Sequence, residues 1–340
     1  MALTRRLLIA GGMAIPTLYS LPRLASASAP PEPVIWQGQA LGAPSKIILY
    51  HPDRSVAERL MRESVREALR LEDIFSLYQP DSELSRLNRA GALASPSKDM
   101  IDLLTICREC WQQSDGLFDP TVQPLWNCLK AHFSQPLPDP AGPSRADWET
   151  ALTKVGFDHV LFDSNRIVFT KKSMALTLNG IAQGYITDRI TALLKAGGVE
   201  HALVDMGEYR AIGHQPDGKP WQIAIAQLEA GSKVEASIDI ADQGLATSSF
   251  SGFQFEDSGR FNHLLNPKTG YSASLYEYLT VVSNDAARAD AWATAFNLMG
   301  EPQISAALDH LPDMWVFARR RNGEHFKLNA PPVFPVSHSF

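Results

Sequence analysis

Apolar side chains recur at helical spacing in several stretches of the chain. Residues 55–75 repeat them every three or four positions, and Ser55 with Glu58 forms a capping box at the start. Residues 181–196 carry one apolar face and stop at a pair of glycines. Together with residues 99–113, these stretches are predicted to be helices.

Short runs rich in β-branched and aromatic residues alternate with these helices. They cover residues 160–162, 166–169, 202–204, 221–226, 279–282, 315–318 and 325–328. The last two runs flank Arg321, Asn322 and Gly323, which is a hairpin signal, and the four prolines of residues 136–143 indicate an exposed loop. Because the elements do not follow a repeating βαβ order, the pattern favours an α+β fold over a doubly wound sheet.

The first 29 residues have the pattern of an export leader. Arg5 and Arg6 precede a short apolar run, and small residues then offer a cleavage site after Ala27 or Ala29. The order Thr-Arg-Arg-Leu-Leu favours a twin-arginine signal over an ordinary secretory leader. The apolar run is too short to anchor the chain in a membrane, and no later stretch is long enough. We therefore expect residues 30–340 to form one mature domain in the periplasm.

Charge and cysteine content narrow the classes of function. Removal of the leader leaves 28 of the 31 basic residues against 37 acidic ones, a formal charge of −9, so we expect no nucleic-acid partner. Cys107 and Cys110 form a C-x-x-C inside a predicted helix, and no second pair or histidine cluster completes a zinc site. This favours a structural role for the pair, with a periplasmic disulfide as the alternative.

The segment 283–300 carries the first candidate for chemistry. Ser283 or Asn284 can cap a helix that runs to the end of this segment, and Asp290 and Thr294 lie one turn apart on one of its faces. A carboxylate one turn from a hydroxyl suits a hard cation such as Mg²⁺, which needs few protein ligands when a substrate phosphate supplies others. The same pair also fits a plain solvent-facing helix.

Three further segments combine polar groups with turn residues. In residues 177–188 a strand is predicted to end, two glycines bracket a turn, and a helix begins. Such a turn lets backbone groups approach a phosphate closely. The alternative is a tight strand-to-helix turn that binds no ligand. Asp119 and Thr121 occupy a polar loop. His263 precedes a turn, where it is a candidate general base or a structural side chain.

Taken in order, these four segments resemble the ApbE family, the FAD:protein FMN transferases. The similarity extends from WQGQALG at residues 36–42 through YQPDSELSRLN at residues 78–88 to ADAWATA at residues 289–295. The resemblance implies a single compact, T-fold-related α+β unit with mixed β-sheets and flanking helices.

The resemblance also implies a Mg²⁺-dependent enzyme that binds FAD, cleaves its pyrophosphate and attaches FMN through a phosphoester to a Thr or Ser of a target protein. Asp290 and Thr294, with the backbone carbonyl of Gly180, are the implied metal ligands. His263 and Asp290 are the implied catalytic residues, with His263 assisting deprotonation of the attacking hydroxyl. Tyr78 is expected to stack on or flank the flavin. The remaining residues of the implied FAD site are Leu41, Phe118, Asp119, Thr121, Thr177, Gln183, Asp188 and Leu264.

The chain departs from the family pattern at several of these positions. Leu41 stands where Met is usual, and Thr177 and Gln183 replace charged residues. Two alternatives therefore stay open beside the transferase: an FAD-binding or delivery protein without transfer, and an FAD pyrophosphatase that releases FMN and AMP. The expected partner of a transferase is a periplasm-facing flavoprotein with an acceptor Thr or Ser, such as a membrane redox subunit.

Overall fold

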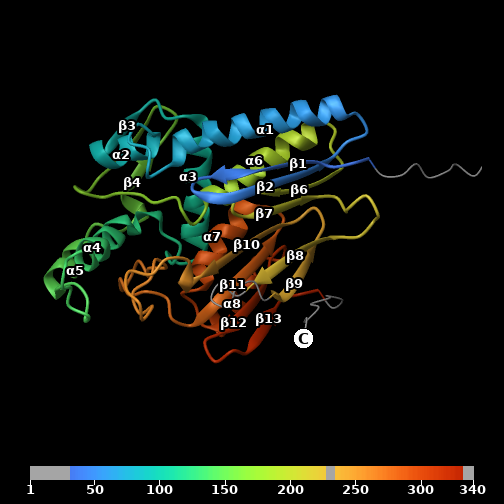
Figure 1. The fold of residues 1–340 in the computed structure, drawn as a ribbon. Helices are drawn as coiled ribbons and strands as arrows, with labels where there is room; N and C mark the ends of the chain where they lie inside the picture. Colours follow the sequence, from blue (N-terminus) through green and yellow to red (C-terminus); the bar gives the residue numbers. More distant parts are fainter. Residues whose placement is uncertain (1–30, 227–233, 332–340) are drawn as a thin grey trace, which may run out of the picture. The chain divides into compact units, whose positions relative to one another are not determined.

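An eight-stranded sheet forms the centre of the described structure (Figure 1). The computed structural model describes residues 31–226 and 234–331, so the predicted leader lies outside the described residues. In spatial order the strands are β1 (Val34–Ala40), β2 (Ala43–Tyr50), β6 (His201–Asp205), β7 (Tyr209–Ile212), β10 (Gly244–Ser249), β11 (Tyr276–Ser283), β12 (Trp315–Arg320) and β13 (His325–Leu328).

The strands of this sheet are antiparallel at every described ladder, rather than mixed as expected. Hairpins join β1 to β2, β6 to β7 and β12 to β13, and a hairpin pairs its two strands antiparallel. The described residues form one compact unit of helices and antiparallel sheets, which confirms the α+β class. No helix in the described ranges is long and apolar enough to cross a membrane.

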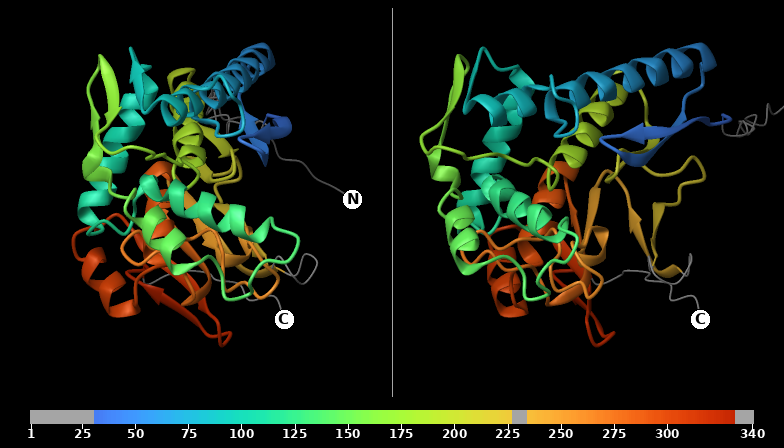
Figure 2. Two further views of the ribbon diagram at one scale, coloured as in Figure 1. Left: turned by 90° about the vertical axis from the view of Figure 1, so that its left-hand side faces the viewer. Right: turned by 60° about the vertical axis from the view of Figure 1, so that its left-hand side comes forward.

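Three helices cover one face of the sheet (Figures 1 and 2). They are α1 (Arg54–Phe75), α6 (Ala182–Ala196) and α7 (Ala286–Phe296). Helix α6 packs on both α1 and α7, and α7 packs on β10 and β11. Nine of the eleven residues of α7 are buried, which is typical of a helix enclosed in the core. Polar side chains on α7 therefore need partners inside the protein.

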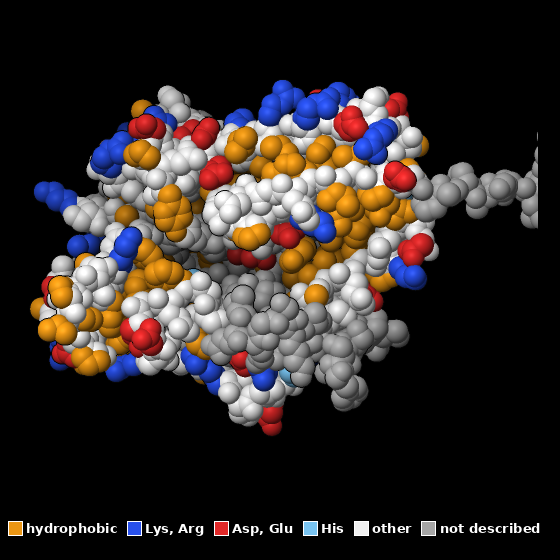
Figure 3. Space-filling model, in the orientation of Figure 1, with side chains coloured by type: hydrophobic (Ala, Val, Ile, Leu, Met, Phe, Trp, Pro, Cys, Tyr) orange, Lys and Arg blue, Asp and Glu red, His pale blue; other side chains and the backbone are white. Residues whose placement is uncertain are grey.

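A two-stranded sheet covers part of the opposite face. β8 (Trp221–Ala226) pairs with β9 (Val234–Ile240), and Ile223 and Ile238 pack with Leu245 and Phe317 of the large sheet. Toward β1 this face is less covered, and Ile35 is 52% exposed. Figure 3 shows hydrophobic side chains gathered below α1 in this region.

The remaining helices and a small sheet lie beside this core. They are α2 (Glu83–Ala90), α3 (Lys98–Gln113), α4 (Gln123–Phe133), α5 (Arg145–Leu152), α8 (Glu301–Leu308), β3 (Ala92–Ala94), β4 (Val160–Phe162) and β5 (Arg166–Phe169). The proline-rich segment after α4 is a loop, as predicted. Helices α4 and α5 pack on each other and come to the front in the left-hand view of Figure 2.

The first helix begins at a different cap from the predicted one. Asp53, not Ser55, caps α1, because its carboxylate accepts from the backbone N–H groups of Ser55 at 2.8 Å and Val56 at 3.2 Å. Glu58 pairs instead with Arg54. Two residue types that favour the N-cap lie close together here, and the carboxylate also benefits from the positive end of the helix dipole.

The boundaries predicted for the helix over residues 283–300 are also wrong. Asp285 caps α7 by accepting from the N–H of Arg288 at 2.8 Å, whereas the hydroxyl of Ser283 donates to Asp313. The helix ends at Phe296. As at α1, an aspartate takes the capping position in place of a serine or asparagine.

The strand predicted to end near Thr177 is not formed. The N–H of Leu176 donates to the side chain of Asn88 at 2.7 Å, and the N–H of Thr177 donates to the carbonyl of Pro120 at 2.8 Å. These partners satisfy the backbone without a neighbouring strand. The chain therefore reaches α6 as an irregular segment.

The cysteine pair in α3 has a structural role. Cys107 and Cys110 are both free and buried, one helical turn apart, and both pack in the large core. Burial raises the pKa of both thiols, that of Cys110 to about 12. The predicted structural role is confirmed, and the disulfide alternative is not formed.

Candidate active site

A cavity of about 630 Å³ lies where several of the predicted segments meet. It is bounded by the chain before α6, the turn between β6 and β7, strands β10 and β11, helices α4 and α7, and the loop around His263. The predicted site residues that line it are Tyr78, Phe118, Asp119, Thr177, Gly180, Gln183, His263, Leu264, Asp290 and Thr294. The fold therefore brings most of the candidate chemistry into one place.

The floor of the cavity includes the polar face of α7. Asp290 is buried, and its Oδ2 accepts from the backbone N–H of Gly184 at 3.3 Å. Thr294 follows one turn later and also lines the cavity. A Cβ atom on Gly180 would lie 2.8 Å from the hydroxyl oxygen of Thr294, so any larger residue at this position would displace the Thr294 hydroxyl. A carboxylate, a hydroxyl and bare backbone thus converge.

A second buried carboxylate, which the sequence did not single out, faces the same cavity. Glu208 lies in the turn between β6 and β7, and its Oε2 accepts from the N–H of Thr247 at 3.2 Å. Burial raises the pKa of both Glu208 and Asp290, and the charge of Asp290 raises the pKa of Glu208 further. A single glutamate after a short strand looks like a surface residue until the strand pairing encloses it.

These donors fit a hard divalent cation. Among the described residues, no salt bridge joins Asp290 or Glu208 to a lysine or arginine, although a buried carboxylate is costly without a compensating charge. Carboxylate, hydroxyl and backbone oxygens are the ligands that Mg²⁺ prefers. No cluster of three or more His, Cys, Asp or Glu side chains suited to a metal occurs in the described ranges. A cation here would therefore take its remaining oxygens from water or from a substrate.

The loop around Asp119 forms a wall of the cavity. Its carboxylate accepts from the N–H and hydroxyl of Thr121 and from the N–H of Phe157. The hydroxyl of Thr121 accepts in turn from the N–H of Gly156 at 2.7 Å, so Thr121 is enclosed and does not line the cavity. Burial raises the pKa of Asp119 to about 6. Both residues therefore shape the wall that presents Phe118.

The hydrogen bonding and burial of His263 favour a neutral imidazole. Its Nδ1 lies 3.1 Å from the carbonyl oxygen of Phe253, which only accepts, so Nδ1 carries the proton and Nε2 keeps its lone pair. Burial lowers the pKa of His263 below the usual 6.5. Neutral imidazole with a free Nε2 is the form that removes a proton from a hydroxyl.

The outer part of the cavity is aromatic. Tyr78 is 75% exposed, and Trp126 and Phe250 line other parts of the cavity. Lys130, which lies over the ring of Trp126, is the one cationic side chain among the described lining residues. An open ring such as Tyr78 can stack on a planar ligand.

Two further predicted site residues lie outside the cavity. Leu41 occupies the turn between β1 and β2, with φ of 48°, and packs on the core. Asp188 forms an ion pair with Arg210 and accepts from the N–H groups of Ala286 and Ala287, each at 2.9 Å. Both side chains face protein rather than the cavity.

Comparison with known proteins agrees with this arrangement. The family model described as "ApbE family" matches residues 41–317. The chain belongs to the ApbE family. Within this family, a relative from Vibrio cholerae is 30% identical over 300 residues, covering 86% of this chain and 89% of the relative. A relative from Salmonella typhimurium is 28% identical over 320 residues, covering 90% of each. Both carry the name FAD:protein FMN transferase.

Solved ApbE structures have the same fold. The flavin transferase ApbE from Vibrio cholerae superposes with a TM-score of 0.76 at 25% identity, covering 88% of this chain and 98% of that one. The ApbE protein from Thermotoga maritima gives 0.77 at 25% identity, with 87% and 97% covered. The family match over residues 41–317 includes all the described residues that line the cavity.

Proposed function

We propose that this chain is an FAD:protein FMN transferase that uses Mg²⁺ and attaches FMN through a phosphoester to a Thr or Ser of a periplasm-facing flavoprotein. One observation carries this proposal: the cavity joins buried Asp290, Thr294 and the bare backbone of Gly180 to a neutral His263. The names of the ApbE relatives support the same activity.

The charge of the cavity favours a cation-dependent reaction. FAD carries an anionic pyrophosphate, and Asp290 and Glu208 on the cavity floor are also anionic when they are deprotonated. These like charges would repel each other unless a cation lies between them. Lys130 lies in the outer, aromatic part. Asp290, Thr294 and the backbone of Gly180 would hold Mg²⁺, which when bound neutralises charge on the phosphates.

Other residues of the chain would bind the flavin and accept the proton of the acceptor hydroxyl. Tyr78 and Leu264 present surfaces for the planar flavin, and Phe118 adds an apolar wall. His263 Nε2 accepts the proton of the acceptor hydroxyl. The hydroxyl oxygen then bonds to the phosphorus of the FMN half, the bond from that phosphorus to the AMP half breaks, and AMP leaves.

The replacements of charged family residues are compatible with binding. Gln183 lies against Gly207, where a Cβ atom would be 2.5 Å from its amide nitrogen. The amide keeps donors at this wall without the charge of a lysine. The backbone N–H of Thr177 donates to the carbonyl of Pro120, and Thr177 lines the cavity. We therefore keep both residues in the proposed FAD site.

A labelling assay tests the proposal. The mature protein is incubated with FAD and Mg²⁺ and with membrane and periplasmic fractions of a source strain that lacks the gene, and flavin fluorescence is recorded after denaturing electrophoresis. We expect a fluorescent protein band that requires Mg²⁺ and disappears with Asp290→Asn. Intact, bound FAD without any labelled band would support the delivery protein, and free FMN with AMP but no band would support the pyrophosphatase.

A further inference from the structure

Asp188 links the second turn of α6 to the first turn of α7. Its two carboxylate oxygens each accept one backbone N–H, Oδ1 from Ala286 and Oδ2 from Ala287, both at 2.9 Å. These donors belong to the first turn of α7, where N–H groups have no partner within the helix. Asp285 satisfies the N–H of Arg288. Two aspartates therefore share the capping of this helix, and one of them comes from another helix.

Arg210 of β7 completes the junction. Its guanidinium pairs with Asp188, and both side chains are only 18% exposed. The pairing uses the Nη1 group of Arg210, whereas its Nε is buried and has no hydrogen-bond partner in the described structure. Asp188 is the carboxylate that forms an ion pair with this arginine, and the pair connects β7, α6 and α7.

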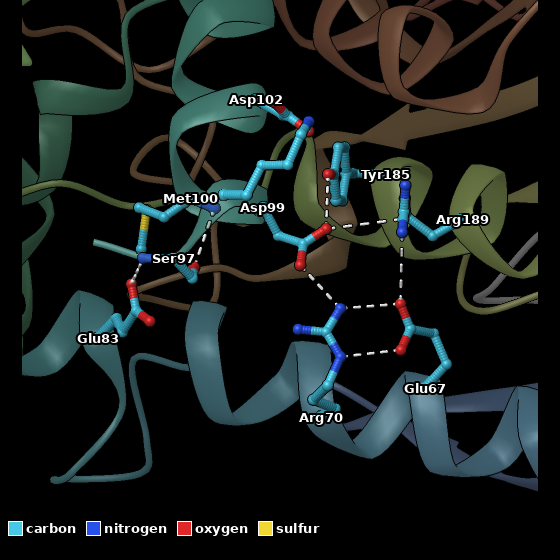
Figure 4. A network of polar contacts seen from close by, with 10 residues as sticks. Glu67, Arg70, Glu83, Ser97, Asp99, Met100, Asp102, Tyr185 and Arg189 are labelled. Carbon is cyan, nitrogen blue, oxygen red and sulfur yellow. Dashed lines mark hydrogen bonds and ion pairs between the residues drawn. The ribbon is translucent and has the colours of Figure 1, made fainter. Parts of the chain in front are cut away.

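Helix α6 is also anchored through Tyr185 and Arg189, which lie three residues before Asp188 and one residue after it (Figure 4). The hydroxyl of Tyr185 donates to Asp99 of α3 at 3.0 Å, and Asp99 accepts from Arg70 of α1 at 2.7 Å. Arg189 lies 3.6 Å from Asp99 and 3.8 Å from Glu67. Because these contacts hold α6 in place, the carboxylate of Asp188 has a fixed position against α7.

Asp290 lies one turn beyond the N–H groups that Asp188 holds. A shift of the start of α7 would therefore move Asp290 and, one turn later, Thr294. The N–H of Gly184 on α6 also donates to Asp290, so α6 fixes the helix at two points. A carboxylate that sets the position of a metal-binding side chain acts like the outer partners of a metal site.

We propose that Asp188 is a positioning residue for the cation site, and that it acts by fixing the first turn of α7 rather than by touching FAD. This inference rests on the proposed cation site. It replaces the FAD contact that the family resemblance implied for this residue. Loss of Asp188 should weaken cation binding and leave the affinity for FAD in the absence of metal unchanged.

Binding of Mn²⁺ as a spectroscopic substitute for Mg²⁺ tests the inference without turnover. Free Mn²⁺ is counted by electron paramagnetic resonance during titration of the flavin-free protein. Asp188→Asn keeps the size of the side chain but removes one acceptor and the charge, so we expect about tenfold weaker Mn²⁺ binding. FAD affinity in EDTA, followed by flavin fluorescence, should equal that of the unmodified protein.

Asp313→Asn is a matched control. Asp313 is 20% exposed and pairs with Arg288 of the same α7 at 3.0 Å, but it accepts no N–H of the first turn. We expect it to bind Mn²⁺ like the unmodified protein. If Asp188→Asn does not fold, Arg210→Lys, which keeps the charge but loses the planar fork, should weaken Mn²⁺ binding in the same direction.

The outcomes separate the inference from the proposed function. Unchanged Mn²⁺ affinity in the folded Asp188 variant, or weaker FAD binding in EDTA, overturns the positioning role while the transferase proposal stands. Absence of Mn²⁺ binding by the unmodified protein overturns the cation site itself, and the positioning role with it.

Discussion

At the residue scale, burial sets the protonation of the groups that face the cavity. His263 is held with Nδ1 toward the carbonyl of Phe253, and burial lowers its pKa below 6.5. A lowered pKa means that the neutral, proton-accepting form persists below the pH at which a free histidine is half charged. The base proposed for the transfer step is therefore available throughout the neutral range.

The pH dependence of labelling follows from this shift. Since only neutral His263 accepts a proton, and saturating Mg²⁺ would keep Asp290 ionised although burial raises its pKa to about 8, we expect the rate at saturating Mg²⁺ to stay within about twofold of its maximum from pH 8 down to 6.5 and to reach half of that maximum only at lower pH. His263→Gln should lower the rate by about 10²-fold or more and remove that acid limb. His132→Gln, which changes a histidine bonded to Asp139 outside the cavity, is the control. A half-maximal point above pH 6.5 would contradict the assignment.

At the element scale, close packing of α6 on α7 positions the cavity floor. A Cβ atom on Gly184 would lie 2.3 Å from the carbonyl oxygen of Ala286, and one on Gly244 would lie 2.6 Å from the N–H of the same residue. The start of α7 therefore packs closely between α6 and β10, and only glycine at both contacts allows this approach.

Gly184→Ala should force the two helices apart. Because the obstacle is backbone and cannot rotate away, we expect a loss of about 1–3 kcal/mol in the free energy of unfolding, measured by urea denaturation. Gly300→Ala serves as the control, since its Cβ would meet nothing closer than 3.8 Å and should cost at most about 1 kcal/mol. Equal stability of the two variants would show that the contact is not tight.

Local sequence patterns predict that a helix or a hairpin forms more accurately than they predict the residue at which it begins or ends. The helical spacing located α3 and α6 nearly to the residue, and the turn residues located the hairpin of β12 and β13. The caps of α1 and α7 differ from the predicted ones because Asp and Ser lie close together at the start of α1, and Ser, Asn and Asp at the start of α7, and each of these side chains can accept the free N–H groups. The segment before α6 was missed because its partners, Asn88 and Pro120, are distant in sequence.

At the scale of the whole molecule, the sequence predicts which segments supply most of the cavity residues, but it does not predict how deeply each residue is buried. Asp290 and Thr294 share a face by helical spacing alone, whereas Glu208 is enclosed only because β7 pairs with both β6 and β10. The role of Asp188 likewise depends on a contact between residues about a hundred positions apart. Such long-range contacts are set by topology, which a single local pattern does not contain.

Export remains a prediction from the leader. Replacement of both Arg5 and Arg6 by lysine keeps the charge but removes the twin-arginine signal, so we expect the chain to stay in the cytoplasm with its leader attached. Arg23→Lys, also in the leader, should leave export unchanged. Cell fractionation with immunoblotting measures both. Normal export of the double variant would indicate an ordinary secretory leader.

The stoichiometry of AMP release and protein labelling tests the central claim most directly. The acceptor protein identified from the labelled band is produced in its flavin-free form and incubated with the mature protein, FAD and Mg²⁺; AMP is then quantified, and the mass of the acceptor is measured by intact-mass spectrometry. We predict one AMP for each FMN attached to a Thr or Ser of the acceptor. AMP and free FMN formed in equal amounts with no mass added to the acceptor would contradict the account.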